Sequence, residues 1–159
     1  GKHTIKLVAY RYGDMAVGAF TLQGDDYKTP YEKRFKELDE SNIAGVTMPE
    51  AKMNDAKLEG QMYQALKNSQ VKEAKNGEVL QIVIIDPDWH LERHKISGAV
   101  LGRHIRAVTA VKEKDGPCWM WRFTFRQDFI GNEFQKVKLD GIYEREKIPE
   151  ANVQKETFK

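Results

Sequence analysis

The sequence contains only one cysteine, Cys118, so the chain has no means of forming an internal disulfide bond. Small secreted domains commonly depend on disulfides, and their absence favours a reducing compartment. Long apolar runs are missing too: the longest, residues 82–85, falls far short of the roughly 20 residues that span a bilayer. We therefore expect an intracellular, cytoplasmic protein with no membrane partner.

Several catalytic and nucleotide-binding motifs are also absent. The sequence has no phosphate-binding loop, no Gly-x-Gly-x-x-Gly pattern and no Gly-x-Ser-x-Gly nucleophile motif. Cys118 lies beside Trp119 in a strand-like segment, and we expect it to be a buried or turn-flanking thiol rather than a nucleophile. Whether the chain is an enzyme therefore stays open at this stage.

What the sequence does contain is the composition of a globular protein. Of its 159 residues 40% are apolar and 31% are charged, and only five are proline. We expect one globular domain over residues 1–146 and a polar, frayed C-terminal tail over residues 147–159. The net charge of +2 is small, but residues 91–126 hold eight Lys or Arg against three acids, which predicts a local basic surface.

The spacing of apolar residues predicts an α+β fold. Alternating or continuous apolar segments, mostly arranged as hairpins, predict strands at residues 3–12, 16–22, 79–85, 105–111, 119–125 and 137–143. Capping boxes at 29–32 and 47–50 predict two main helices, the second running to about Lys75 with Gly60 as its weakest point. Residues 89–94 should add about one helical turn. Together these elements predict a mostly antiparallel sheet of about five to six strands, with the two helices packed on one face.

The strand at 119–125 predicts a basic sheet face. Its alternation places four aromatic residues in the core and two arginines on the opposite face. Neighbouring strands add further cations and two tyrosines, and such a face suits single-stranded DNA or RNA because cations follow phosphates while rings stack on bases. The predicted nucleic-acid-binding residues are Lys6, Tyr10, Tyr12, Arg103, Arg106, Arg122 and Arg126. The competing interpretation is an ordinary solvated sheet face, whose field nearby acids such as Glu113, Asp115 and Asp128 would partly neutralise.

A second hypothesis is a metal-dependent hydrolase acting on phosphodiesters. On the expected helical turn two histidines four residues apart would share one face, and a carboxylate just before them could complete a site for one divalent metal ion. The candidate ligands are Asp86, Asp88, His90 and His94. The pattern departs from that of zincins, because Leu91 stands where they need Glu, and from that of zinc deaminases, because Trp121 stands where they need a second Cys. An N-cap at Asp86 followed by surface histidines would explain the same residues without a metal.

The third hypothesis is a protein–protein interaction module without catalysis. An acidic helix over residues 31–40, or an exposed edge of the sheet, would then contact a protein partner. The sequence favours nucleic-acid binding, or binding of another polyanion, only slightly over this alternative.

Overall fold

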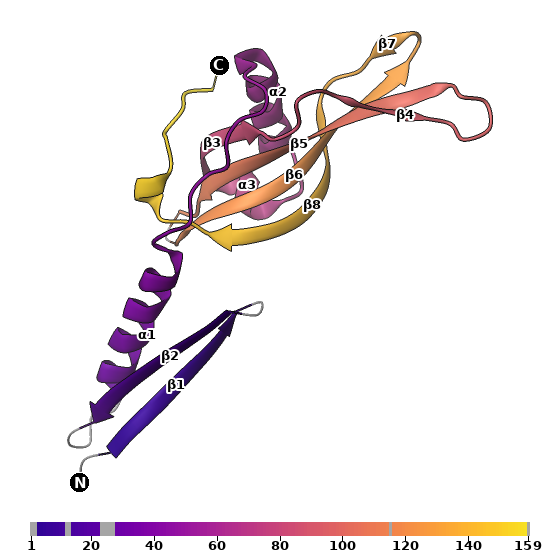
Figure 1. The fold of residues 1–159 in the computed structure, drawn as a ribbon. Helices are drawn as coiled ribbons and strands as arrows, with labels where there is room; N and C mark the ends of the chain where they lie inside the picture. The colour runs from indigo at the N-terminus through magenta and orange to yellow at the C-terminus, as the bar shows by residue number, and fades with distance from the viewer. Residues whose placement is uncertain (1–2, 12–13, 23–27, 115, 159) are drawn as a thin grey trace. The chain divides into compact units, whose positions relative to one another are not determined.

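The computed structural model describes residues 3–11, 14–22, 28–114 and 116–158, with side chains from residue 32 onward. The chain divides into two compact units, residues 1–45 and residues 46–159 (Figure 1), and each is described by itself. The first unit holds a hairpin and one helix. The second holds a six-stranded sheet with two further α-helices.

The first unit follows the sequence pattern closely. Strands β1 (His3–Arg11) and β2 (Asp14–Leu22) pair antiparallel, as the alternating residues and the turn between them predict. Helix α1 (Lys28–Ile43) contains the predicted capping box in its first turns and ends slightly beyond the expected boundary.

The second unit is built on an antiparallel sheet, so the prediction of an α+β fold is confirmed. Its strands are β3 (Glu78–Ile84), β4 (His90–Arg93), β5 (Val100–Lys112), β6 (Cys118–Ile130), β7 (Glu133–Phe134) and β8 (Lys138–Lys147). The long strands β5 and β6 form its centre. On the β5 side lie β3 and β4, and on the β6 side lie β8 and β7.

The helices of the second unit differ from the sequence prediction. Helix α2 (Ala56–Lys67) begins well after the box at residues 47–50, because Lys52 N–H donates to the Ile84 carbonyl at 2.9 Å and so keeps that segment extended beside β3. The actual N-cap is Asp55, whose carboxylate accepts the Leu58 N–H at 3.0 Å. The helix passes through Gly60 without a break and ends at Lys67, with Asn68 as its C-cap. A short helix α3 (Lys72–Asn76) follows.

Helix α2 covers one face of the sheet and forms the main core with it. Its buried stripe of Leu58, Met62 and Leu66 belongs to the same cluster as Phe123 and Phe125 of β6. Burial of each such side chain stabilises the fold by about 1.5–3 kcal/mol. The alternation of residues 119–125 therefore correctly identifies a core face.

The C-terminal segment packs instead of fraying. Ile148 and Val153 join Leu80, Ala110 and Cys118 in a second cluster on the opposite face of the sheet. Beyond the 3₁₀ turn η1 (Glu150–Asn152), Glu156 N–H donates to the Leu80 carbonyl at 2.8 Å. The sequence prediction missed this packing because residues 147–159 are mostly polar and only a few of them are apolar. The segment also covers part of the outer edge of β3.

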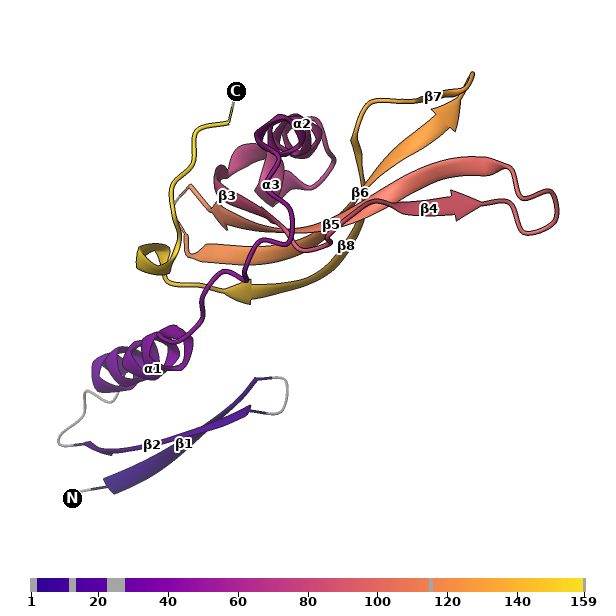
Figure 2. The ribbon, with the colours of Figure 1, turned by 45° about the horizontal axis from the view of Figure 1, so that its top comes forward.

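Residues 89–94, expected to be helical, instead contain strand β4. Strand β5 extends beyond the end of β3 at Ile84, so its edge there needs another partner for its backbone groups. β4 supplies that partner, with His90 opposite His104. The arm, as it is called here, consists of residues 90–104 and 126–134, that is, of β4, β7, this half of β5 and the end of β6. It extends past α2 (Figures 1 and 2).

Candidate functional site

The sheet face opposite α2, called here the polar face, brings three of the predicted arginines together. The pairing of β5 with β6 places His104 opposite Arg126, Arg106 opposite Thr124 and Val108 opposite Arg122. Residues directly opposite in an antiparallel pair project from the same face. Arg106, Arg122 and Arg126 therefore share one side of the sheet.

Each of these arginines is held by a carboxylate. Arg106 Nη2 lies 2.7 Å from Asp86 Oδ1, and Arg122 Nη1 lies 2.9 Å from Glu144 Oε1. Arg126 is held by two acids, through a bond of 2.8 Å from Nε to Asp128 Oδ1 and a contact of Nη1 with Glu92. The cations of the polar face are thus balanced by acids of the same face, which reduces its attraction for a polyanion.

The pKa values reflect this pairing. Burial alone would raise the pKa of Asp86, but the hydrogen bonds and charge of Arg106 outweigh it and hold that pKa below its usual value. The Lys138 ammonium and the Arg126 guanidinium likewise lower the pKa of Asp128. Both carboxylates are therefore ionised near neutral pH and remain paired with their cations.

The remaining predicted nucleic-acid residues lie elsewhere. Arg103 projects from the α2 side of the sheet, where its guanidinium lies 4.4 Å from the Trp89 ring centre and 4.0 Å from that of Phe134. Its Nε donates to Gln127 Oε1 at 2.8 Å. Lys6 and Tyr10 are strand residues of the first unit whose side chains lie outside the described part, as does all of Tyr12.

Of the four candidate metal ligands, the structure brings Asp86 and His90 together and leaves Asp88 and His94 with other partners. Asp86 is only 2% exposed, accepts the Arg106 N–H at 2.8 Å, and lies 3.4 Å from His90 Nε2. His94 lies beyond the end of β4, with its Nδ1 3.1 Å from Ser97 Oγ, and Asp88 accepts the adjacent Trp89 N–H at 2.7 Å. Within the described residues, no group of three or more His, Cys, Asp or Glu is placed to hold a metal ion.

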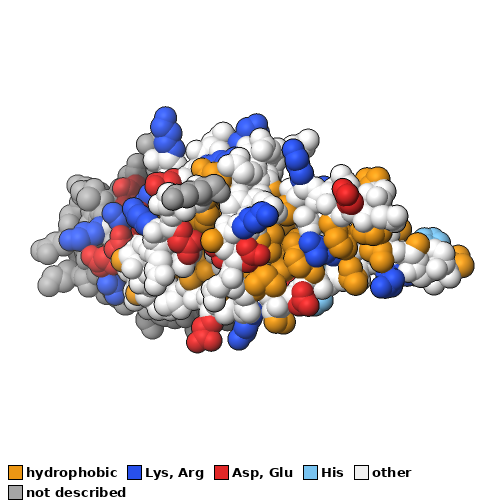
Figure 3. Space-filling view, turned by 90° about the horizontal axis from the view of Figure 1, so that it is seen from above, with side chains coloured by type: hydrophobic (Ala, Val, Ile, Leu, Met, Phe, Trp, Pro, Cys, Tyr) orange, Lys and Arg blue, Asp and Glu red, His pale blue; other side chains and the backbone are white. Residues whose placement is uncertain are grey.

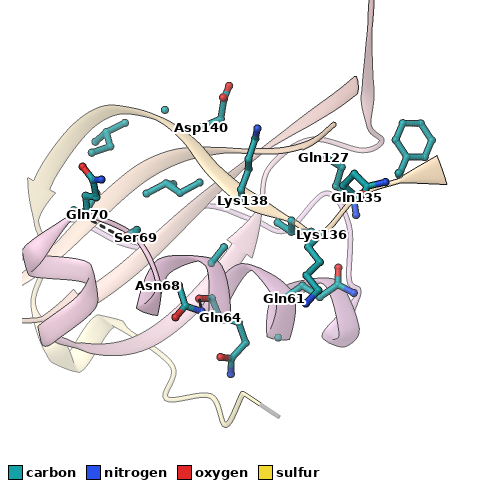
Figure 4. Close-up of a pocket in the computed structure, with 18 of the residues that line it drawn as sticks. Gln61, Gln64, Asn68, Ser69, Gln70, Gln127, Gln135, Lys136, Lys138 and Asp140 are labelled. Atoms are coloured by element: carbon teal, nitrogen blue, oxygen red, sulfur yellow. Dashed lines mark hydrogen bonds between the residues drawn. The ribbon is translucent and has the colours of Figure 1, made fainter. Parts of the chain in front are cut away.

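A cleft between α2 and β8 has a volume of about 1470 Å³. Figure 4 shows Gln61, Gln64 and Asn68 on the helix side of the cleft and Lys138 and Asp140 on β8, where the side chains of Lys138 and Asp140 point away from the helix. The three carboxamides are spaced i, i+3 and i+7, so they share one face of α2. Apolar side chains also line the cleft, namely Ala65, Val71, Phe134, Val137, Leu139 and Ile142.

Seen from above, hydrophobic side chains continue from this region along the arm (Figure 3). Leu91 and Leu101 belong to the arm and are 52% and 39% exposed. Leu91 lies opposite Arg103 in the register, so it projects from the α2 side of the sheet. The cleft and the arm therefore expose apolar surface on one side of the second unit.

The cleft is the feature that the sequence prediction missed. Its only local signal is the stripe of carboxamides on α2, which by itself is an ordinary solvated helix face. The opposite wall comes from residues 127–142, far along the chain, and only the paired sheet brings it to the helix.

Comparison with protein families, with curated proteins and with solved structures finds no match to this chain. Among the described helices, none has the length and apolar character needed to cross a membrane.

Proposed function

We propose that the chain is a protein-interaction module without catalysis, which binds a segment of a partner polypeptide in the cleft between α2 and β8. The observation that carries this proposal is the combination, in one open cleft, of a carboxamide-bearing helix face with a strand that, among the described residues, pairs on one side only. A carboxamide both donates and accepts hydrogen bonds, so it can pair with the N–H or the C=O of a peptide group.

The chemistry of the lining favours binding over catalysis. Among the described residues that line the cleft, Asp140 is the one carboxylate and there is no histidine or cysteine. Ser69 donates from Oγ to the Leu66 carbonyl at 2.7 Å, which engages its hydroxyl in the end of α2. The described lining thus offers no nucleophile paired with a base of the kind that acyl or phosphoryl transfer requires.

Nucleic-acid binding by the polar face is the second candidate. It is favoured by the exposure of the Arg106 and Arg122 side chains, 50% and 46%, on one face of the sheet. Phosphates would have to compete with Asp86 and Glu144 for these guanidinium groups, which would make binding weak and strongly dependent on salt.

The test is a selection of peptides from a random displayed library on the immobilised full chain, followed by fluorescence anisotropy of the enriched peptides. Gln61→Ala combined with Gln64→Ala should weaken their binding roughly tenfold, since each lost hydrogen bond costs about 0.5–1.5 kcal/mol. Both positions are exposed in a helix, where alanine is favourable, so the variant should fold. The control variant is Arg122→Ala with Glu144→Ala. It removes one positive and one negative charge from the polar face, so the net charge is unchanged, and it should bind the peptides as well as the wild type.

Two results would contradict the proposal. One is the absence of any peptide enriched above the bare support. The other is equal binding of the enriched peptides to the wild type and to the cleft variant. Labelled single-stranded DNA and RNA measured at about 50 and 200 mM salt test the second candidate, which requires salt-sensitive binding that the control variant loses.

A further inference from the structure

The two outer edges of the sheet differ in the residues that lie along them. Beside β3, residues 52–53 and 154–156 occupy the edge: Met53 bridges to Ile84, and Ile82 N–H donates to the Glu156 carboxylate at 3.2 Å. Strand β8 pairs with β6 alone in the described sheet, and its residues 138–142 line the cleft. An uncovered edge carries unpaired N–H and C=O groups, which are a template for another strand.

Strand β4 also has one partner strand among those that the structure describes, but it is four residues long and none of its residues lines the cleft. β8 is ten residues long. Its register with β6 shifts between Leu139 and Gly141 and between Ile142 and Glu144, yet its edge still offers more backbone groups than that of β4. The α2 carboxamides line the same cleft as the first half of β8.

Gly141 leaves room for the close approach of a further backbone. A Cβ at this position would come no nearer than 3.8 Å to any neighbouring atom, an ordinary contact, so packing within the chain does not require glycine there. A glycine in a strand costs stability, and it often marks a bulge, such as the register shift beside Gly141, or a place where another backbone comes close.

The charge of the cleft indicates the kind of segment that would bind. Lys57 and Lys136 are exposed lining residues, and neither makes an ion pair with any residue that the structure describes. Lys138 is already engaged by Asp128, and Asp140 is the one acid in the lining. The unpaired charge is therefore positive and complements an acidic segment.

We infer that the partner segment is an acidic, extended peptide of roughly five residues that adds to the edge of β8 as a further strand. Its backbone bonds to β8, while its acidic side chains meet Lys57 and Lys136. This inference rests on the proposed function, because it specifies the ligand and the binding mode of the same cleft.

The binding mode is tested by N-methylation, one residue at a time, of the peptide most enriched on the full chain. A strand added to an edge uses alternate N–H groups, so methylation should reduce affinity tenfold or more at every second residue and have little effect between them. Hydrogen exchange of the complex should also slow within residues 138–142. A scan without alternation, or unchanged exchange in β8, would overturn strand addition and leave peptide binding in the cleft standing.

The charge preference is tested with Lys57→Glu combined with Lys136→Glu. This variant should bind the same peptide at least about fivefold more weakly at low salt, and the difference should shrink as salt rises. The charge-matched control is Lys95→Glu with Lys114→Glu, two exposed positions outside the cleft. Enriched peptides that are neutral or basic, or an equal loss in both variants, would overturn the acidic preference, whereas failure to enrich any peptide would overturn the proposed function itself.

Discussion

At the scale of single residues, the carboxylate of Asp86 joins the end of β3 to β5. It accepts both the backbone N–H of Arg106, at 2.8 Å, and that residue's guanidinium, at 2.7 Å. Hydrogen bonds to a buried charged group contribute about 1.5–3 kcal/mol, so Asp86→Asn should lower the free energy of unfolding by about 2 kcal/mol at pH 7. Asp88→Asn, at an exposed carboxylate two residues away, should change it by less than about 0.5 kcal/mol.

The contribution of Asp86 should also depend on pH. Its pKa is lower in the folded chain than in the unfolded chain, where it is about 3.9. The stabilisation is therefore present above about pH 4 and is lost as the pH falls through the lower folded pKa. Urea denaturation of the wild type and Asp86→Asn between pH 7 and pH 2.5 measures this, and a difference that stays constant over that range would contradict it.

Lys67 has a comparable structural role at the end of α2. Its ammonium donates to three carbonyls around the end of α3: to Gly77 at 2.6 Å, to Lys75 at 3.2 Å and to Ala74 at 3.4 Å. Lys67→Met keeps most of the apolar stem but removes these bonds, and should lower the free energy of unfolding by about 2 kcal/mol. Lys57→Met on the same helix is the control, and equal effects of the two substitutions in urea denaturation would show that the carbonyl contacts add nothing.

At the scale of elements, the start of α2 distinguishes two capping signals. Asp55→Ala removes the bond to the Leu58 N–H and should destabilise the fold by about 1 kcal/mol. Thr47→Ala, within the capping box that the sequence suggests, should cost less than about 0.5 kcal/mol because no helix begins there. Thermal unfolding followed by circular dichroism measures both variants, and a larger effect at Thr47 would contradict the assignment of Asp55 as the cap.

The elements that the sequence predicts correctly are those with a local cause. The hairpin of β5 and β6 follows from period-two alternation, which also identifies the core aromatics such as Phe123 and Phe125. β4 could not be predicted this way, because the spacing of His90 and His94 also suits a helix, and what makes the segment a strand is the unpaired edge of β5. The cleft is harder still to predict, since its walls come from residues 57–71 and 127–142 and exist only after the sheet has paired.

The same reasoning applies to the polar face. Alternation correctly places Arg106, Arg122 and Arg126 on one side of the sheet. It gives no information on the acids that hold them, because Asp86, Glu92 and Glu144 reach these guanidinium groups from other strands or from a loop. Charge counted along a segment therefore overestimated the basic character of the surface.

At the scale of the whole molecule, both described hydrophobic clusters lie within residues 46–159. This unit thus contains the sheet, α2, the cleft and the residues that cover the edge of β3. A unit with its own core is expected to fold by itself. A chain of residues 46–159 should therefore unfold in one cooperative urea transition, and should bind the enriched peptides within about twofold of the full chain's affinity.

A chain of residues 1–45 serves as the comparison. It should not bind these peptides, because the described residues that line the cleft all lie in the second unit. If residues 46–159 alone unfolded without cooperativity, the division into two units would not describe folding. If they folded cooperatively but bound no peptide, binding would require residues 1–45, and the α2–β8 cleft could not by itself be the site.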